Sequence, residues 1–236
     1  MTGLSRQITL LAATALTLVM NYLSNALPLF GNSNADVSDR LPNAFTPAGV
    51  TFAVWGPIFL GLVVFAVYQA LPAQRGPRLD RLFWPFLLSN LFNVSWLLAF
   101  QSLNLGLSVL IMLGLLGTLI WLYLRVRGLP PQGAEGLTLA LPSSLYLAWV
   151  SQGVTAGLAG LGAAWSAVLV VIAALIGVFF LVRFRDWAFA AVLLWAFYGV
   201  YLARPEVTAV VIGVALAAAL VLLGMVLAAR RPRSAL

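Results

Sequence analysis

Long runs of apolar residues, separated by short polar stretches, set the pattern of this chain. A helix needs about 20 mostly apolar residues to cross the hydrocarbon core of a bilayer. Eight segments reach or approach that length, near residues 7–29, 48–71, 82–101, 104–124, 137–156, 162–182, 187–203 and 207–229. The seventh is short and is bounded by Asp186 and Arg204, so a seven-span alternative makes it a re-entrant or interfacial segment. The pattern predicts an all-α integral membrane protein with about eight transmembrane helices.

The composition indicates which solvent surrounds these helices. Of the 236 residues, 63% are hydrophobic and 8% are charged, whereas about a quarter of the residues in a soluble domain are charged. So few charges cannot cover a water-facing surface. The lipid bilayer is therefore the expected partner of most of the chain.

The thirteen basic residues are all arginine, and their positions predict an orientation. If both termini are cytoplasmic, eleven arginines lie inside: Arg6, Arg75, Arg78, Arg81, Arg125, Arg127, Arg183, Arg185, Arg230, Arg231 and Arg233. Only Arg40 and Arg204 then lie outside. Cytoplasmic loops are enriched in Arg and Lys, so we predict a multi-pass protein of a bacterial inner membrane with both termini cytoplasmic. Because the arginines form short clusters between apolar runs, nucleic acid is not an expected partner despite the net charge of +7.

The chain lacks the residues of common catalytic and metal sites. It has no cysteine, no histidine and no lysine, which removes thiolate and imidazole metal ligands, the usual general base and Schiff-base chemistry. Asp36 and Asp39 lie in a polar loop with no base beside them. We predict no catalytic residues, no metal site and no required cofactor, and a binding protein is favoured over an enzyme.

Amides and aromatic residues concentrate in the first, second, third and fifth spans. In the third span Asn90, Asn93, Leu97 and Gln101 share one helical face, with Trp96 beside Asn93. Polar side chains in a bilayer usually face the bundle interior. Trp55 and Trp149 also fall in the outer halves of their spans, so large rings and an amide at similar depth could line a flat apolar pocket. The alternative is that the amides join helices and the tryptophans form interfacial belts.

The sixth and eighth spans are plain Val, Leu, Ala and Gly helices. This change divides the chain into a working unit, residues 1–160, and a packing unit of three more spans with a short basic tail, residues 161–236. The longest polar connection, residues 30–47, leads into the helix of Trp55. It could be a lid over the pocket or a solvated linker.

Three segments resemble the TspO/translocator-protein family (TspO/MBR), also called tryptophan-rich sensory proteins. They are FTPAGVTFAVWGPIF at 45–59, LFNVSWLLAFQ at 91–101 and LPSSLYLAWVSQGVTAG at 141–157, and they follow the order of the family's five-helix unit. Longer bacterial relatives with extra helices share the N-x-x-S/A-N-x-L-P stretch, here 21–28. The resemblance implies that the first five spans form a TspO-like bundle. Gln152 departs from the small or apolar residue of the family pattern.

The resemblance also implies a ligand and a site. The family binds porphyrins and other flat apolar molecules among its helices. The matching positions are Trp55 and Trp149 flanking the ligand, Phe59, Asn93, Trp96 and Tyr146 lining the pocket, Pro47 covering it, and Asn25 completing the set. The expected partner is a hydrophobic small molecule, such as a tetrapyrrole, that is sensed or translocated. An exporter of small apolar solutes and a light-dependent porphyrin-degrading activity are the alternatives, and a homo-oligomer is left open.

Overall fold

The computed structural model describes residues 3–27, 29–40, 46–130, 132–159 and 163–230. Within these ranges the regular structure is entirely helical, in agreement with the predicted fold class. The long helices are α1 (Gly3–Ala26), α3 (Trp55–Ala70), α4 (Phe83–Gln101), α5 (Leu105–Arg127), α6 (Leu141–Ala159), α7 (Ala163–Phe184), α8 (Trp187–Ala203) and α9 (Thr208–Arg230). Each coincides with one of the eight predicted spans.

Five segments in the described part are long and apolar enough to cross a membrane. They are Gly3–Ala26, Gly49–Ala70, Pro77–Gln101, Leu105–Arg127 and Thr208–Arg230. Val171–Phe184 and Trp187–Ala203 are shorter apolar helices. The protein is therefore a multi-pass membrane protein, as its sequence predicted.

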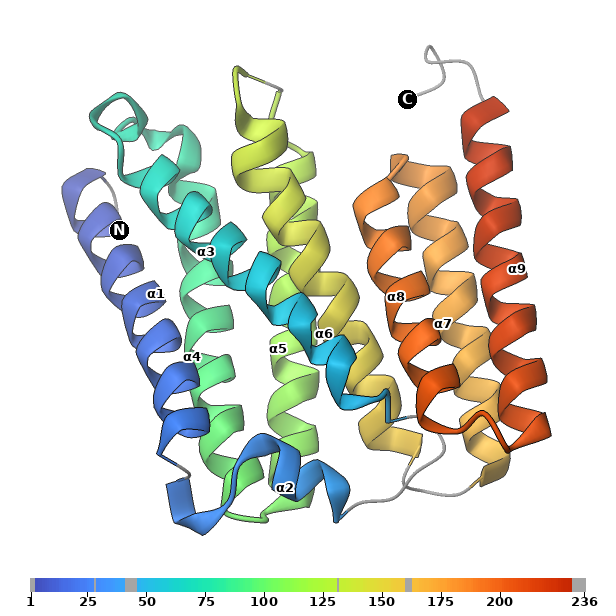
Figure 1. Cartoon of the computed structure of the whole chain (residues 1–236). Helices are drawn as coiled ribbons and strands as arrows, with labels where there is room; N and C mark the ends of the chain where they lie inside the picture. Colours follow the sequence, from blue (N-terminus) through green and yellow to red (C-terminus); the bar gives the residue numbers. More distant parts are fainter. Residues whose placement is uncertain (1–2, 28, 41–45, 131, 160–162, 231–236) are drawn as a thin grey trace. The chain divides into compact units, whose positions relative to one another are not determined.

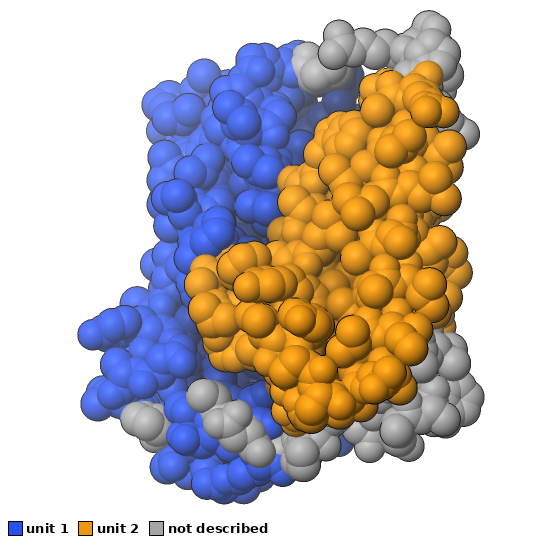
Figure 2. Space-filling model, turned by 45° about the vertical axis from the view of Figure 1, so that its right-hand side comes forward, with its two compact units in different colours: residues 1–40, 55–150 blue, residues 41–54, 151–236 orange. Residues whose placement is uncertain are grey.

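The chain divides into two compact units, which Figure 2 colours separately. Unit 1 comprises residues 1–40 and 55–150, and unit 2 comprises residues 41–54 and 151–236. The predicted boundary near residue 160 and the basic tail after residue 230 lie outside the described residues. Both remain predictions.

Close helix packing in unit 1 depends on small residues. α1 packs against α3 and α4, and α4 packs against α5 (Figure 1). A Cβ at Gly114 of α5 would lie 2.9 Å from the ring of Phe92 on α4. A Cβ at Gly61 of α3 would lie 3.1 Å from the Cβ of Pro142 on α6. These glycines let neighbouring helices approach closely, as small residues do in membrane bundles.

Pro57 and Pro142 lie where a helix changes type. Pro57 is in the first turn of α3, directly after the 3-10 helix η2 (Gly49–Val54). Pro142 is the second residue of α6, directly after the π-helical turn η5 (Gly136–Ala140). Because each α-helix continues directly from another helical turn, the proline lacks an amide that could have donated to a carbonyl of that turn, and the helix changes type at this point. The prolines therefore mark how α3 and α6 begin.

In unit 2, α7, α8 and α9 pack against one another (Figure 1). The buried stripe of α9 consists of Val214, Ala217, Val221, Gly224 and Ala228. Of the small residues Ala209, Gly213 and Ala217, which share one helical face, only Ala217 is buried. The buried face of α9 therefore contains larger apolar residues as well as small ones.

The segment before α3 packs on α8 within unit 2. The backbone amide of Ala48 donates to the carbonyl of Gly199 at 2.9 Å. The indole Nε1 of Trp195 donates to the carbonyl of Thr51, also at 2.9 Å. A Cβ at Gly199 would lie 2.5 Å from Cγ2 of Thr51 and 2.8 Å from Cβ of Pro47. Only glycine permits this approach.

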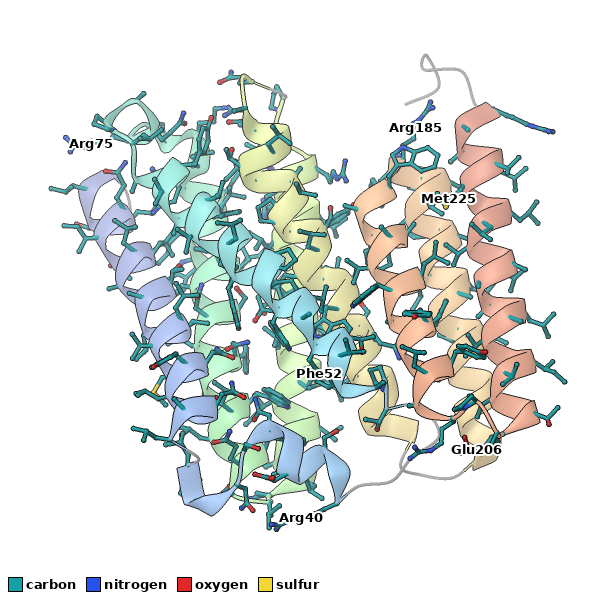
Figure 3. The ribbon with its side chains drawn as sticks, viewed as in Figure 1. Arg40, Phe52, Arg75, Arg185, Glu206 and Met225 are labelled. Carbon is teal, nitrogen blue, oxygen red and sulfur yellow. The ribbon has the colours of Figure 1, made fainter. Side chains whose placement is uncertain are left out.

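A buried arginine, Arg6, holds α1 against the residues that follow α3 at one end of unit 1. The side chain of Arg6 is fully buried, pairs with Asp80 at 2.5 Å and donates to the carbonyls of Gln74 and Gly76. Arg75 lies between Gln74 and Gly76 in the sequence, and Arg40 directly follows α2 (Asn34–Asp39). The two arginines lie at opposite ends of unit 1 (Figure 3), and which end is cytoplasmic stays a prediction.

Candidate ligand-binding site

Four aromatic rings of unit 1 form a cluster where α3 and α6 meet. Trp55 is stacked on Phe59, with ring centroids 5.1 Å apart and an interplanar angle of 20°. Trp55 also makes edge contacts with Tyr146, at 6.0 Å and 66°, and with Trp149, at 6.4 Å and 82°. We call Trp55, Phe59, Tyr146 and Trp149 the ring cluster. Stacked and edge-to-face geometries are both favourable for aromatic pairs.

Helical spacing explains how the ring cluster forms. Trp55 opens α3, and Phe59 follows one turn later on the same face. Tyr146 and Trp149 are three residues apart on α6 and are both buried. Trp55 and Phe59 are only half-buried, so one side of the ring cluster can still be reached from outside.

A chain of side-chain amides reaches the ring cluster from α1 through α4. Asn21 Nδ2 donates to Asn93 Oδ1 at 2.7 Å, and Asn93 Nδ2 donates to the hydroxyl of Tyr146 at 2.8 Å. All three residues are at least 93% buried. One turn away, Thr17 Oγ1 donates to Asn90 Oδ1 at 2.8 Å. The predicted polar face of α4 is confirmed, since Asn90, Asn93, Leu97 and Gln101 are all buried.

The C-terminal end of α4 contacts the first part of the connection 30–47. Gln101 Nε2 donates to the carbonyl of Ser24 at 2.9 Å and to Asn34 Oδ1 at 3.0 Å. Asn32 Nδ2 donates to the carbonyl of Gln101 at 3.1 Å. This part of the connection includes the short helix α2, which the sequence did not predict. It is folded and attached to unit 1, unlike a solvated linker.

A capping box explains α2. The Ser33 hydroxyl accepts from the backbone amide of Asp36, and the Asp36 carboxylate accepts from the backbone amide of Ser33 at 2.8 Å. The Ser33 hydroxyl also donates to the Asp36 carboxylate at 2.7 Å, and this bond, with the one from the Ser33 backbone amide, lowers the pKa of Asp36 below its usual range. The sequence S-x-x-D carried this signal.

The remaining predicted residues lie apart from these ring contacts. Trp96 is half-buried and stacked on Phe100, with centroids 4.9 Å apart. Asn25 is exposed, and its Nδ2 donates to the carbonyl of Asn21 at 2.8 Å. Pro47 belongs to unit 2 and packs on Gly199. The structure therefore brings together five of the eight predicted site residues: Trp55, Phe59, Asn93, Tyr146 and Trp149.

Two features of the contacts were not assigned from sequence. The sequence does not show that Asn21 is the donor that orients Asn93. Nor does the sequence show that the indole of Trp195 donates to the carbonyl of Thr51. The four-residue spacing of Thr17, Asn21 and Asn25 was the available signal for the first. No local signal pointed to the second, because its partner is 144 residues away.

The chemistry of the ring cluster is stacking and hydrogen bonding. Its described contacts are with rings and a neutral amide, and within the described ranges no group of three His, Cys, Asp or Glu residues could hold a metal ion. Flat apolar molecules bind to sites of this composition, in which a few polar groups set the orientation.

Comparison with known proteins adds the family. The family model described as TSPO-like protein matches residues 7–228, almost the full length of the chain. The chain belongs to the TSPO-like protein family. No curated protein and no solved structure matches it. The match extends through α9, so the family pattern includes the helices beyond the fifth predicted span.

Proposed function

We propose that this TSPO-like protein binds a flat hydrophobic ligand, such as a porphyrin or another tetrapyrrole, at the ring cluster. The observation that carries the proposal is the contact of Trp55 with both Tyr146 and Trp149. Its half-buried ring offers an aromatic face that a planar molecule can stack against. The residues proposed to take part are Trp55, Phe59, Asn93, Trp96, Tyr146, Trp149, Pro47 and Asn25, and the bound ligand is then sensed or translocated.

Titration of the purified protein with protoporphyrin tests this proposal. Saturable quenching of tryptophan fluorescence is expected, and Trp55→Ala and Trp149→Ala should each weaken the apparent affinity about tenfold, because each removes a ring from the ring cluster. Trp84→Ala is the matched control, since Trp84 is 56% exposed and lies in the first turn of α4. Quenching that does not saturate, or that is the same in all variants, would contradict the proposal.

The membrane arrangement is part of the proposal. All eight long helices cross a bacterial inner membrane, with both termini in the cytoplasm. Support comes from the eleven arginines placed inside by this topology and from the separation of Arg75 and Arg40 within unit 1 (Figure 3). Reporter domains fused after residue 236, and after residue 204 in a truncated chain, should report the cytoplasm and the outside, respectively. The opposite pair of results would overturn the topology.

A further inference from the structure

The side-chain hydrogen bonds in unit 1 form a chain with a fixed direction. Asn21 Nδ2 has two acceptors, the carbonyl of Thr17 at 2.8 Å and Asn93 Oδ1 at 2.7 Å. The Thr17 carbonyl can only accept. The amide of Asn21 must therefore present its nitrogen, because turning it over would face one oxygen with another.

That choice fixes the next two residues. Since Asn21 donates, Asn93 must present Oδ1 to it, and the nitrogen of Asn93 then faces Tyr146. Asn93 Nδ2 donates to the Tyr146 hydroxyl at 2.8 Å, so the phenol oxygen is an acceptor here. The assignment rests on the backbone carbonyl of Thr17, the first group in this series of hydrogen bonds, because a carbonyl can only accept.

The proton of the Tyr146 hydroxyl stands at the end of this series of hydrogen bonds. Within the described residues the Tyr146 hydroxyl donates to no acceptor, and the residue is 1% exposed. Buried polar hydrogens in native proteins almost always have a partner, which can be a ligand or a water. The Tyr146 ring lies in the ring cluster, 6.0 Å from that of Trp55. The uncommitted proton is therefore held by the same side chain that the proposed ligand would contact.

We infer that Tyr146 is a specificity-determining residue that donates its phenol proton to a hydrogen-bond acceptor on the ligand. The inference rests on the proposed function and narrows it to planar aromatic molecules that carry an acceptor, such as a carbonyl oxygen or an imine-type ring nitrogen, at the edge that meets Tyr146. A ligand presenting only an N–H or O–H there would meet another donor. Asn21 and Asn93 act as positioning residues, because they hold the phenol oxygen as the acceptor and leave its proton for the ligand.

A matched pair of probes tests this preference. Fluorene and 9-fluorenone are planar tricyclic molecules that differ in a methylene and a carbonyl. Binding of each is measured by tryptophan quenching with the full-length protein in detergent. Their affinity ratio is compared between variants, so that unequal partition into detergent cancels. In Tyr146→Phe the ratio should shift about three- to tenfold against fluorenone, the effect of one hydrogen bond.

Tyr123→Phe is the control. Tyr123 is equally buried, at 1% exposed, but lies on α5 and makes none of the ring-cluster contacts. It should leave the affinity ratio unchanged. If Tyr146→Phe also leaves the ratio unchanged, a buried water satisfies the phenol and the inference is overturned, while the proposed site stands. If neither probe binds the unaltered protein saturably and protoporphyrin also fails to bind, the proposed function itself fails and the inference with it.

A second measurement uses the vibrational spectrum of the bound ligand. The carbonyl stretch of 9-fluorenone bound to the unaltered protein should lie at lower frequency than in an apolar solvent, as expected for a carbonyl that accepts a hydrogen bond. Asn93→Leu removes the donor that holds the phenol oxygen and should broaden or shift this band. A bound carbonyl band at the apolar-solvent frequency would overturn the inference.

Discussion

Asn93 on α4 donates to the hydroxyl of Tyr146 on α6 across 2.8 Å, 53 residues apart in the chain. With the bond from Asn21, it ties three helices of unit 1 together at the ring cluster. Interhelical amide bonds of this kind contribute about 1 kcal/mol each in membrane proteins. The same residues that shape the proposed site therefore also stabilise the bundle.

The first prediction concerns this bond. Asn93→Leu leaves the amide of Asn21 and the oxygen of Tyr146 buried without their partner, and it should lower the free energy of unfolding by about 1 to 3 kcal/mol. Denaturation in mixed micelles measures the change. Ser95→Ala, at an exposed position of the same helix, should stay within about 0.5 kcal/mol. Equal effects of the two substitutions would argue that the amide chain is not stabilising.

The second prediction concerns the buried ion pair of Arg6. Arg6→Ala removes three contacts and leaves Asp80 without its partner, so we expect the free energy of unfolding to fall by about 3 kcal/mol. Asp80→Asn should cost less, because Arg6 keeps two carbonyl acceptors and Asp80 is 20% exposed. Arg81→Ala is the control, since Arg81 makes one long bond, 3.4 Å, to the carbonyl of Gly128. The loss of unfolding free energy should be largest for Arg6→Ala, smaller for Asp80→Asn and smallest for Arg81→Ala. Any other order contradicts the prediction.

The third prediction concerns the approach of residues 47–51 to α8. Gly199→Val places a side chain where Thr51 and Pro47 lie within 3 Å, and it should destabilise unit 2 by about 1 to 3 kcal/mol. Gly213→Val is the matched control, because a Cβ there meets nothing within 4 Å. The chain has no cysteine, so a single Thr51→Cys substitution gives a local readout. Maleimide labelling of this buried position should be slow, and it should accelerate with Gly199→Val but not with Gly213→Val.

The fourth prediction is that replacing two buried glutamines by leucine changes the free energy of unfolding in opposite directions. Gln152 is 1% exposed, and neither polar atom of its amide has a hydrogen-bond partner within the described ranges. Gln69 is equally buried, but its Nε2 donates to the carbonyls of Gln7 and Ala66. Gln152→Leu should therefore raise the free energy of unfolding by about 1 kcal/mol, and Gln69→Leu should lower it by a similar amount. A loss of stability in Gln152→Leu would mean that a water or a ligand uses the amide.

The fifth prediction is a pH dependence of α2. Hydrogen bonds to Ser33 lower the pKa of Asp36 in the folded protein. A lowered pKa means that the carboxylate stabilises α2 fully above its unfolded value, about 3.9. This contribution is lost as the pH falls through the lower folded value. Hydrogen exchange at residues 34–39 should therefore show more local opening of α2 on acidification below about pH 4 than at pH 6. In Ser33→Ala, which removes a partner of the carboxylate, the change should be smaller.

Several parts of this structure follow from local sequence. Each predicted span coincides with a helix because apolar runs of this length bury their backbone polar groups only by forming helices in lipid. The polar face of α4 was also predictable, because the positions of Asn90, Asn93, Leu97 and Gln101 follow from helical geometry alone. Ser33 and Asp36 carry a capping signal that is local to the sequence.

Other parts required the assembled helices. Periodicity places Tyr146 on a face of α6, but it cannot show that this hydroxyl meets Asn93 or that the Thr17 carbonyl fixes the direction of the bond. Trp55 and Trp149 were paired through a family resemblance and a similar depth, and their contact depends on how Gly61 lets α3 approach Pro142.

The sequence by itself thus determined the solvent, the helices and the polar faces, since these follow from side-chain chemistry and a repeat of 3.6 residues. Only the tertiary structure decided which faces meet, because pairing depends on contacts between residues far apart in the chain. It also decided where residues 47–54 pack. Their partners on α8, Trp195 and Gly199, lie about 150 positions away, and the fit depends on a backbone approach that no local pattern encodes.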